Sequence, residues 1–446
     1  MSGSRTKAPG FAGGYLPQAD PALLARLDEL KARLQKLESA QDRESEAEAE
    51  ALRGERDDLL LRAKLLQPEY SELPENRIAT VAQIRAALPE QTTLVSFFTL
   101  PEKTIAWVVD REGLSLVELA PSRGELSDEV QGYRSAIAAE GYPAGDSGRS
   151  SRGVEVVDSG LPGAKSMSQD LYRSLIAPLV PHLRSARLVL VPHGALQQLP
   201  WAALQDPETG RFLAQDFTLS LLPAAGALVA GSKSTELQSD GPMRALVFGD
   251  PAAAIPSLPP LPAARREAES VARILGTTAK VGKEASESAL RGAAASLSLL
   301  HLAAHGEQDS KEPRSSFLAL APDAEQDGRL KMDEIFDELR LRRRPLVVLS
   351  ACQSGLGKRS GGDEIEGMIR AFLYAGAGAV VATLWSIDDE ASALLIESLY
   401  QNLVAGRPAA EALRGAQLAM IAHPKYGAPF YWAGFALTGD PSKALR

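Results

Sequence analysis

The sequence predicts an α/β fold in which a mostly parallel sheet is flanked by helices on both faces. Short runs of apolar residues alternate with longer segments of helical periodicity, and these runs lack the polar alternation of a half-exposed strand. The clearest runs are 245–248, 299–304 and 346–351. At 446 residues the chain is also longer than one ordinary core, so two or three domains are expected.

The composition argues against several classes of protein. A net charge of −9 disfavours direct binding of nucleic acid, which needs a basic surface. No apolar run reaches the roughly 18 residues of a membrane helix, and the N-terminus lacks the apolar core of a signal peptide. The single cysteine, Cys352, cannot form an internal disulfide, so we expect a cytoplasmic protein. Five histidines without an H-E-x-x-H motif predict neither a metal centre nor another cofactor.

The N-terminal region is predicted to be helical after a flexible lead-in at residues 1–20. Residues 21–85 are expected to form a helical hairpin or coiled-coil segment, because leucines recur there at spacings of four and three. Two interpretations remain open: a solvated packing helix, or a seam that binds further helices or a regulatory partner. The seam consists of Leu23, Leu27, Leu30, Leu34 and Leu37.

Residues 86–235 are predicted to form a first α/β half. A three-stranded meander precedes two helices and a strand that ends in Pro192-His193-Gly194. The stretch 141–165 is expected to be an exposed loop, and 231–242 a linker, because both are rich in glycine and serine. The expected strands are 94–100, 104–109, 114–119 and 186–191, and the expected helices are 126–139 and 169–183.

Residues 240–446 alternate more regularly and are predicted to form the second half, with each helix crossing between parallel strands. The expected strands are 245–248, 280–281, 299–304, 317–320, 346–351, 379–384 and 431–437. The expected helices are 262–275, 284–294, 332–339, 364–374, 388–405 and 408–422.

Two strands of the second half end in residues that carry chemistry. His305 follows the run 299–304, and Cys352 follows the run 346–351. In open α/β sheets, residues just past the carboxyl ends of the strands line the ligand crevice. The two residues are 352 − 305 = 47 positions apart with one helix between them, so their strands are expected to be neighbours, about 4.8 Å apart.

A cysteine and a histidine at this edge suit nucleophilic catalysis. A thiolate attacks a carbonyl carbon, and an imidazole takes the thiol proton and later protonates the leaving amine. The backbone N–H groups of Gly306 and Cys352 are the natural oxyanion donors, because glycine leaves the approach open. No third catalytic residue can be placed from the sequence. The alternative is that Cys352 is a small buried hydrophobe and His305 a structural residue.

Several motifs in the same order resemble one family. Ser350-Ala351-Cys352-Gln353-Ser354-Gly355 shares the A-C-Q core of the caspase signature, which has its histidine about 50 residues upstream. Together with 302–306, 381–389 and 430–435, this segment resembles the CHAT domain, a caspase-like module related to caspases and separase. The resemblance covers about residues 85–440.

The resemblance implies a caspase-like fold and a cysteine endopeptidase that cleaves a protein substrate through a thioester acyl-enzyme. The dyad then consists of Cys352 as nucleophile and His305 as general acid/base. Residues 86–235 become a non-catalytic, pseudo-caspase-like half, and His193-Gly194 a structural turn. Many members carry a controlling array of tetratricopeptide repeats before the domain; none is visible here. A bacterial role in defence or regulated cell death is suggested by this analogy alone.

The loop 385–390 resembles the separase loop that supplies an acidic group to the pocket for the residue before the cut bond. Asp389, with Asp388, would then bind a P1 arginine or lysine. The alternative is that these acids only cap the helix that starts there. If cleavage follows basic residues, the segments Arg149–Arg152 and Lys358-Arg359 are candidate self-cleavage sites, although both suit ordinary loops as well.

Three other functions compete with this interpretation, and only the first stays open as an alternative. A catalytically silent caspase-like scaffold or interaction module would use the same fold, but the presence of both dyad residues weighs against it. A nucleotide-binding domain would need a phosphate-binding glycine loop after a strand, and Gly376-Ala377-Gly378 precedes its strand instead. A serine hydrolase would need G-x-S-x-G, which the sequence lacks.

Overall fold

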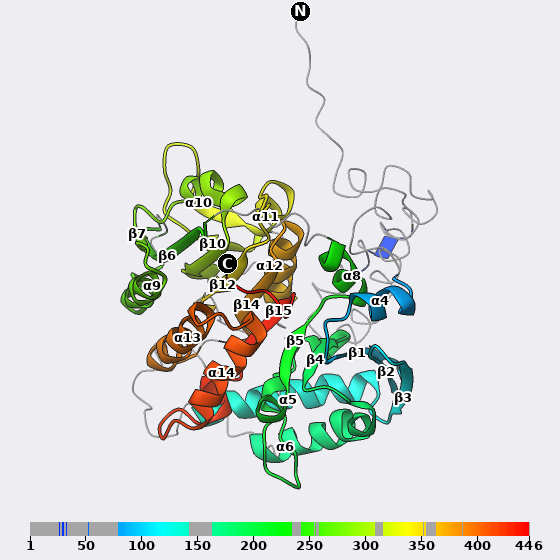
Figure 1. The fold of residues 1–446 in the computed structure, drawn as a ribbon. Coiled ribbons are helices and arrows are strands. Elements are labelled where there is room, and N and C mark those ends of the chain that lie inside the picture. Colours follow the sequence, from blue (N-terminus) through cyan, green and yellow to red (C-terminus); the bar gives the residue numbers. More distant parts are fainter. Residues whose placement is uncertain are drawn as a thin grey trace, which may run out of the picture. The chain divides into compact units, whose positions relative to one another are not determined.

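The computed structural model describes residues 79–141, 163–233, 242–253, 255, 258–307, 315–350, 352–353, 363–385 and 387–445, with single residues 26, 29, 30, 33 and 52 (Figure 1). The chain divides into two compact units, Met1–Ala79 and Thr80–Arg446. In the first unit Leu30 is helical and buried. The other leucines of the predicted seam lie outside the described residues, as do both candidate self-cleavage segments.

The unit Thr80–Arg446 is built on one sheet of eleven strands, in the order β3-β2-β1-β4-β5-β15-β14-β12-β8-β6-β7. The pairs β3–β2, β2–β1 and β14–β15 are antiparallel, and the other neighbours are parallel. Helices flank this sheet, so the predicted α/β fold class is confirmed.

The first half contributes the strands on one side of this sheet. They are β1 (Thr92–Thr99), β2 (Thr104–Val109), β3 (Leu114–Leu119), β4 (Arg187–Val191) and β5 (Thr218–Leu221). The helices are α4 (Val81–Ala87), α5 (Arg123–Gly141), α6 (Ala164–Leu171), α7 (Leu213–Asp216) and α8 (Ala225–Lys233). Short helical turns are η1 (Tyr172–Ile176), η2 (Ala177–His182), η3 (Gly194–Gln198) and η4 (Trp201–Ala203).

The second half contributes the strands on the other side. They are β6 (Ala245–Pro251), β7 (Lys280–Gly282), β8 (Leu299–Ala303), β12 (Leu346–Leu349), β14 (Ala379–Thr383) and β15 (Phe435–Gly439). A second sheet, in the order β11-β10-β9-β13, consists of β9 (His305–Glu307), β10 (Phe317–Ala319), β11 (Arg329–Lys331) and β13 (Cys352–Gln353). The helices are α9 (Pro262–Leu275), α10 (Glu287–Ala293), α11 (Met332–Asp337), α12 (Asp363–Tyr374), α13 (Asp389–Val404) and α14 (Ala409–Ile421), with turns η6 (Ala294–Ser296) and η8 (Pro429–Tyr431).

The central strands are buried on both faces, which explains why they are apolar without alternation. Alternate residues of β12 point into different cores: Leu346 and Val348 face one side, and Val347 and Leu349 face the other. The first core contains α9, α13 and α14 and continues across β4 and β1 to α5. The second contains α10, α11 and α12 (Figure 1). The two halves therefore share a sheet, through β5 and β15, and one of its cores.

Two predicted elements are wrong in detail. The helix expected at 169–183 is an α-helix only to Leu171, and then continues as a π-helix and a 3₁₀ turn. Pro178 and Pro181 lack the backbone N–H groups that an α-helix needs. The strand expected at 431–437 begins only at Phe435, because Pro429–Tyr431 forms a 3₁₀ turn in which Phe430 is buried.

Candidate active site

The strand ends that carry His305 and Cys352 are held in register. In the main sheet β8 pairs with β12, Leu299 with Leu346 through Leu302 with Leu349, an offset of 346 − 299 = 47 positions. Both segments then leave this sheet and pair again as β9 and β13, where Cys352 lies opposite His305 at the same offset, 352 − 305 = 47. The backbones of the two residues are therefore direct neighbours, about 4.8 Å apart by strand spacing.

The second sheet fixes the backbone of β9 from both sides. His305 lies opposite Ala319 of β10, and Gly306 lies opposite Leu318 of β10 and Gln353 of β13. A segment paired on two sides cannot shift along its neighbours without breaking both ladders. The register of His305 against Cys352 thus depends on β10 as well as on β13.

The ring of His305 is buried, with 5% of the residue exposed, and its Nε2 lies 2.7 Å from the carbonyl oxygen of Pro259. A carbonyl oxygen only accepts hydrogen bonds, so Nε2 must carry the proton and donate. In the neutral ring this tautomer leaves the lone pair on Nδ1, the nitrogen that would accept a proton. A main-chain carbonyl therefore holds the ring of His305 in this orientation.

The segment that presents this carbonyl is anchored by Asp250, at the end of β6. The backbone N–H of Leu261 donates to Asp250 Oδ1 at 2.7 Å, and the guanidinium of Arg265 donates to Oδ2 at 3.1 and 2.9 Å. Asp250 adopts φ +48°, a left-handed conformation that aspartate tolerates better than most residues. Sequence reasoning missed both Pro259 and Asp250. The only signal was the proline-rich run 259–262, which restricts the backbone.

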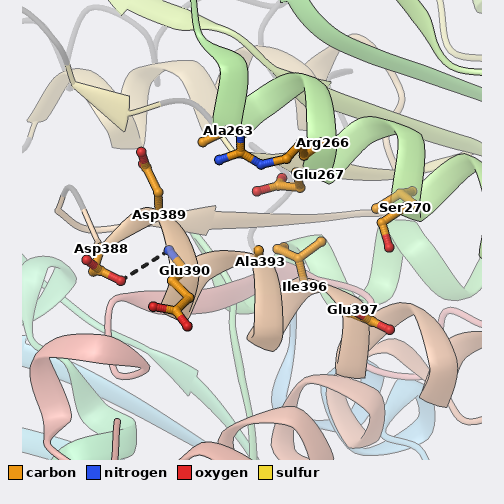
Figure 2. A pocket seen from close by; sticks show the side chains of 11 residues that line it. Ala263, Arg266, Glu267, Ser270, Asp388, Asp389, Glu390, Ala393, Ile396 and Glu397 are labelled. Carbon is orange, nitrogen blue, oxygen red and sulfur yellow. Dashed lines mark hydrogen bonds between the residues drawn. The ribbon is translucent and has the colours of Figure 1, made fainter. Parts of the chain in front are cut away.

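Asp388 and Asp389 lie at the start of α13, after β14, and both are exposed. Asp388 is the N-cap residue: its Oδ1 accepts from the backbone N–H groups of Glu390 and Ala391, each at 3.1 Å. A capping role thus accounts for one oxygen of Asp388. Asp389 occupies the first helical turn and lines a cavity between α9 and α13 (Figure 2).

The first half contacts the loop that precedes these aspartates. Arg134 of α5 donates to the carbonyl oxygen of Leu384 at 3.0 Å and to the side chain of Gln198. Within the second half, Trp385 Nε1 donates to the carbonyl oxygen of Phe430 at 3.0 Å. The first half therefore bonds to the main chain at Leu384, just before the segment that carries Asp388 and Asp389.

Among the described residues, no three His, Cys, Asp or Glu side chains are placed to hold a metal ion. In the same part of the chain no helix is both long and apolar enough to cross a membrane.

The fold and the site define an α/β domain with a histidine and a cysteine on paired strands at the carboxyl edge of a parallel sheet. Residues 165–440 match the CHAT domain family, so the chain belongs to that family, as its motifs indicated. Tetratricopeptide repeat protein 28 of Mus musculus is 29% identical over 337 residues, which are 63% of this chain and 13% of that protein. The chain thus spans only a small part of this curated relative.

Two solved structures are similar at low sequence identity. The crystal structure of the Arg-specific cysteine proteinase gingipain R has a TM-score of 0.40 and 12% identity, covering 72% of this chain and 76% of its own. The Saccharomyces cerevisiae separase–securin complex has a TM-score of 0.47 and 11% identity, covering 95% of this chain and 38% of its own.

Proposed function

We propose that the chain is a cysteine endopeptidase with Cys352 as nucleophile and His305 as general acid/base. The observation that carries this proposal is the backbone register of Cys352 opposite His305, combined with the hydrogen bond from His305 Nε2 to Pro259 O. A histidine oriented by a fixed acceptor beside a cysteine is the arrangement that nucleophilic catalysis needs.

The reaction follows from these groups. His305 Nδ1 takes the thiol proton, and the Cys352 thiolate attacks the scissile carbonyl carbon. The backbone N–H groups of Gly306 and Cys352 stabilise the tetrahedral oxyanion. The C–N bond then breaks as His305 returns the proton to the leaving amine, which leaves a thioester. Water, deprotonated by His305, hydrolyses the thioester and regenerates the thiol.

Asp389 is proposed to bind a basic side chain at P1. It is exposed at the carboxyl edge of β14, and β14 is the neighbour of β12, the strand that leads to Cys352. A carboxylate there pairs with arginine in a bidentate geometry or with lysine as a point charge. Asp388 contributes to the same negative field while it caps α13.

Regulation by a partner is proposed as well. A relative that is similar in sequence is named for tetratricopeptide repeats, and the match covers 13% of its length. In this proposal a helical region or a partner that contacts the N-terminal unit controls the site in a cytoplasmic setting.

A second function, an interaction module without catalysis, has one observation in its favour. The outer face of the meander β1–β3 exposes large apolar side chains: Phe98 is 41% exposed, Leu114 47% and Leu116 56%. Exposed apolar side chains of this kind suit a protein interface.

Cleavage of a peptide library tests the proposal against this alternative. The expected result is cleavage after arginine or lysine by the wild-type chain and none by Cys352→Ala. Preference for aspartate or apolar P1 residues would overturn the Asp389 assignment. Equal cleavage by both proteins, or by neither when candidate partners are added, would overturn the peptidase proposal.

A further inference from the structure

The helices α9 and α13 enclose a cavity of about 370 Å³ (Figure 2). We call it the α9–α13 groove; it lies between Ala263–Val271 of α9 and Asp388–Glu397 at the start of α13. Small side chains face it at helical spacing from both walls: Ala263 and Ser270 from α9, and Ala393 from α13. Because these side chains are short, they do not fill the space between the helices.

The groove is strongly acidic. Five of its lining side chains are carboxylates and Arg266 is the single cation among them; Glu390 is paired with Lys425 Nζ at 3.0 Å, and Asp388 caps α13. Asp389 and Glu397 lie on one stripe of α13, separated by Ala393 at intervals of four residues. Glu397 Oε1 accepts a hydrogen bond from the neutral amide of Gln401 at 3.2 Å, and no ion pair to Glu397 is present among the described residues.

Glu267 lies inside the groove, between the two helices (Figure 2), and only 7% of the residue is exposed. Its Oε1 is 3.2 Å from Nε2 of His301, but neither atom has a hydrogen-bond partner among the described residues. His301 is fully buried in β8, and its Nδ1 bonds with the hydroxyl of Tyr400 at 3.0 Å. Oε1 faces His301 in the core and is shielded from the groove, so a cation in the groove would interact with the Glu267 carboxylate through its charge and not through a bond to this oxygen.

The geometry favours an organic cation over a metal ion. As noted above, the described residues offer no three-ligand metal set, and the acidic groups are spread along two helices. Asp389 and Glu397 are eight residues apart, which is about 12 Å along a helix. An extended peptide advances about 3.3 Å per residue, so it covers this distance in three to four residues.

We propose that the α9–α13 groove is a second cation-binding subsite, in which Glu397 and Glu267 bind a basic side chain of the substrate peptide. Along the peptide, that side chain is three to four residues away from the basic residue that Asp389 binds. The inference rests on the proposed function, because it takes Asp389 as the position of the first basic residue. The substrate class then becomes peptides with two spaced basic residues.

Binding without cleavage tests this subsite on the full chain carrying Cys352→Ala. Fluorescent peptides with one arginine, or with two arginines three or four residues apart, are compared by anisotropy at low salt. The second arginine is expected to tighten binding about five- to tenfold, and Glu397→Gln should remove most of this gain. Glu267→Gln should do the same. Arg266→Ala should tighten binding of the two-arginine peptide severalfold, because it removes the competing charge.

Glu269→Gln is the matched control, because Glu269 is exposed on α9 and does not line the groove. It should leave the gain unchanged. If the second arginine gives no gain, or if Glu397→Gln and the control behave alike, the subsite does not exist. Glu397 is a helix-surface residue, so this comparison holds even where Glu267→Gln fails to fold. Cleavage of the one-arginine peptide by the wild-type chain is a separate readout, so failure of the peptidase proposal is distinguishable from failure of the subsite.

Discussion

Two strands of the sheet, one in each half, end in a histidine followed by a glycine, but their surroundings differ. After β4, His193 Nδ1 accepts from the backbone N–H of Thr99 at 3.3 Å and bonds with its hydroxyl at 2.8 Å. After β8, His305 Nε2 donates to Pro259 O at 2.7 Å. In His193 the hydrogen bonds to Thr99 therefore use Nδ1. In His305 the hydrogen bond to Pro259 uses Nε2 instead.

The neighbouring strand differs as well. β1 pairs with β4 at an offset of 187 − 92 = 95 positions, and the same offset places Phe98 beside His193. The two rings lie 4.6 Å apart, centroid to centroid. In the second half, the corresponding neighbour of His305 is Cys352. A histidine and a glycine at a strand end therefore do not define a site; the partner of the ring and the residue on the adjacent strand do.

The largest expected difference between the two ends is catalytic. Cys352→Ala and His305→Ala should each lower kcat/KM by about 10³-fold or more, because each removes a group that acts in the transition state. His193→Ala should change kcat/KM less than about threefold. Peptide cleavage under identical conditions measures all three. A loss with His193→Ala as large as that with His305→Ala would contradict the assignment of the halves.

The two aspartates of the second half should separate into a binding role and a capping role. Asp389→Asn should lower kcat/KM for an arginine substrate about 30-fold, because it removes a charge-assisted pair, and should affect an apolar substrate little. Asp388→Ala should instead lower the free energy of unfolding by about 1 kcal/mol through loss of the cap. Urea denaturation and P1-matched substrates measure the two effects. The prediction fails if Asp388→Ala, rather than Asp389→Asn, changes the P1 preference.

Substitutions of the groups that orient the rings of His305 and His193 should have smaller effects. Asp250→Ala frees the Leu261 segment and should lower kcat about tenfold with little change in KM, because Pro259 no longer holds the ring in one orientation. Asp250→Asn keeps an acceptor for Leu261 and should retain more activity. Thr99→Val is the counterpart in the first half: it removes the hydroxyl bonded to His193 and should cost about 1 kcal/mol of stability with kcat unchanged. An equal loss of kcat in Thr99→Val would show that both effects are general destabilisation.

The smallest expected effect concerns pH. Burial, followed by the charge of Arg123, lowers the pKa of His193 below its ordinary value of 6.5. Between the lowered pKa and 6.5, the unfolded chain binds more protons than the folded one, so the stability from this residue falls as the pH falls through that window. Thermal melts at pH 5 and pH 7 should therefore differ less in His193→Gln than in the wild type. An unchanged difference would show that other groups govern the acid sensitivity.

The sequence predicted most of the sheet and the pair of strand ends, because long apolar runs and a helix between them constrain β8 and β12. It missed β5, β9, β11 and β13, which are two to four residues long and exist only through their neighbours. The role of Pro259 could not be predicted either. Every residue has a main-chain carbonyl, so the sequence does not reveal which one accepts the hydrogen bond from His305. Glu267 and His301 lie in a helix and a strand that were predicted, but their contact depends on how α9 packs on β8.

The most direct test of the central claim is labelling by a peptide electrophile that carries arginine at P1, with the modified residue located by mass spectrometry. We expect one adduct, on Cys352, which forms in the wild type and in His193→Ala but much more slowly in His305→Ala. An unreactive Cys352 in the presence of candidate activators, or labelling that is indifferent to His305, would contradict it.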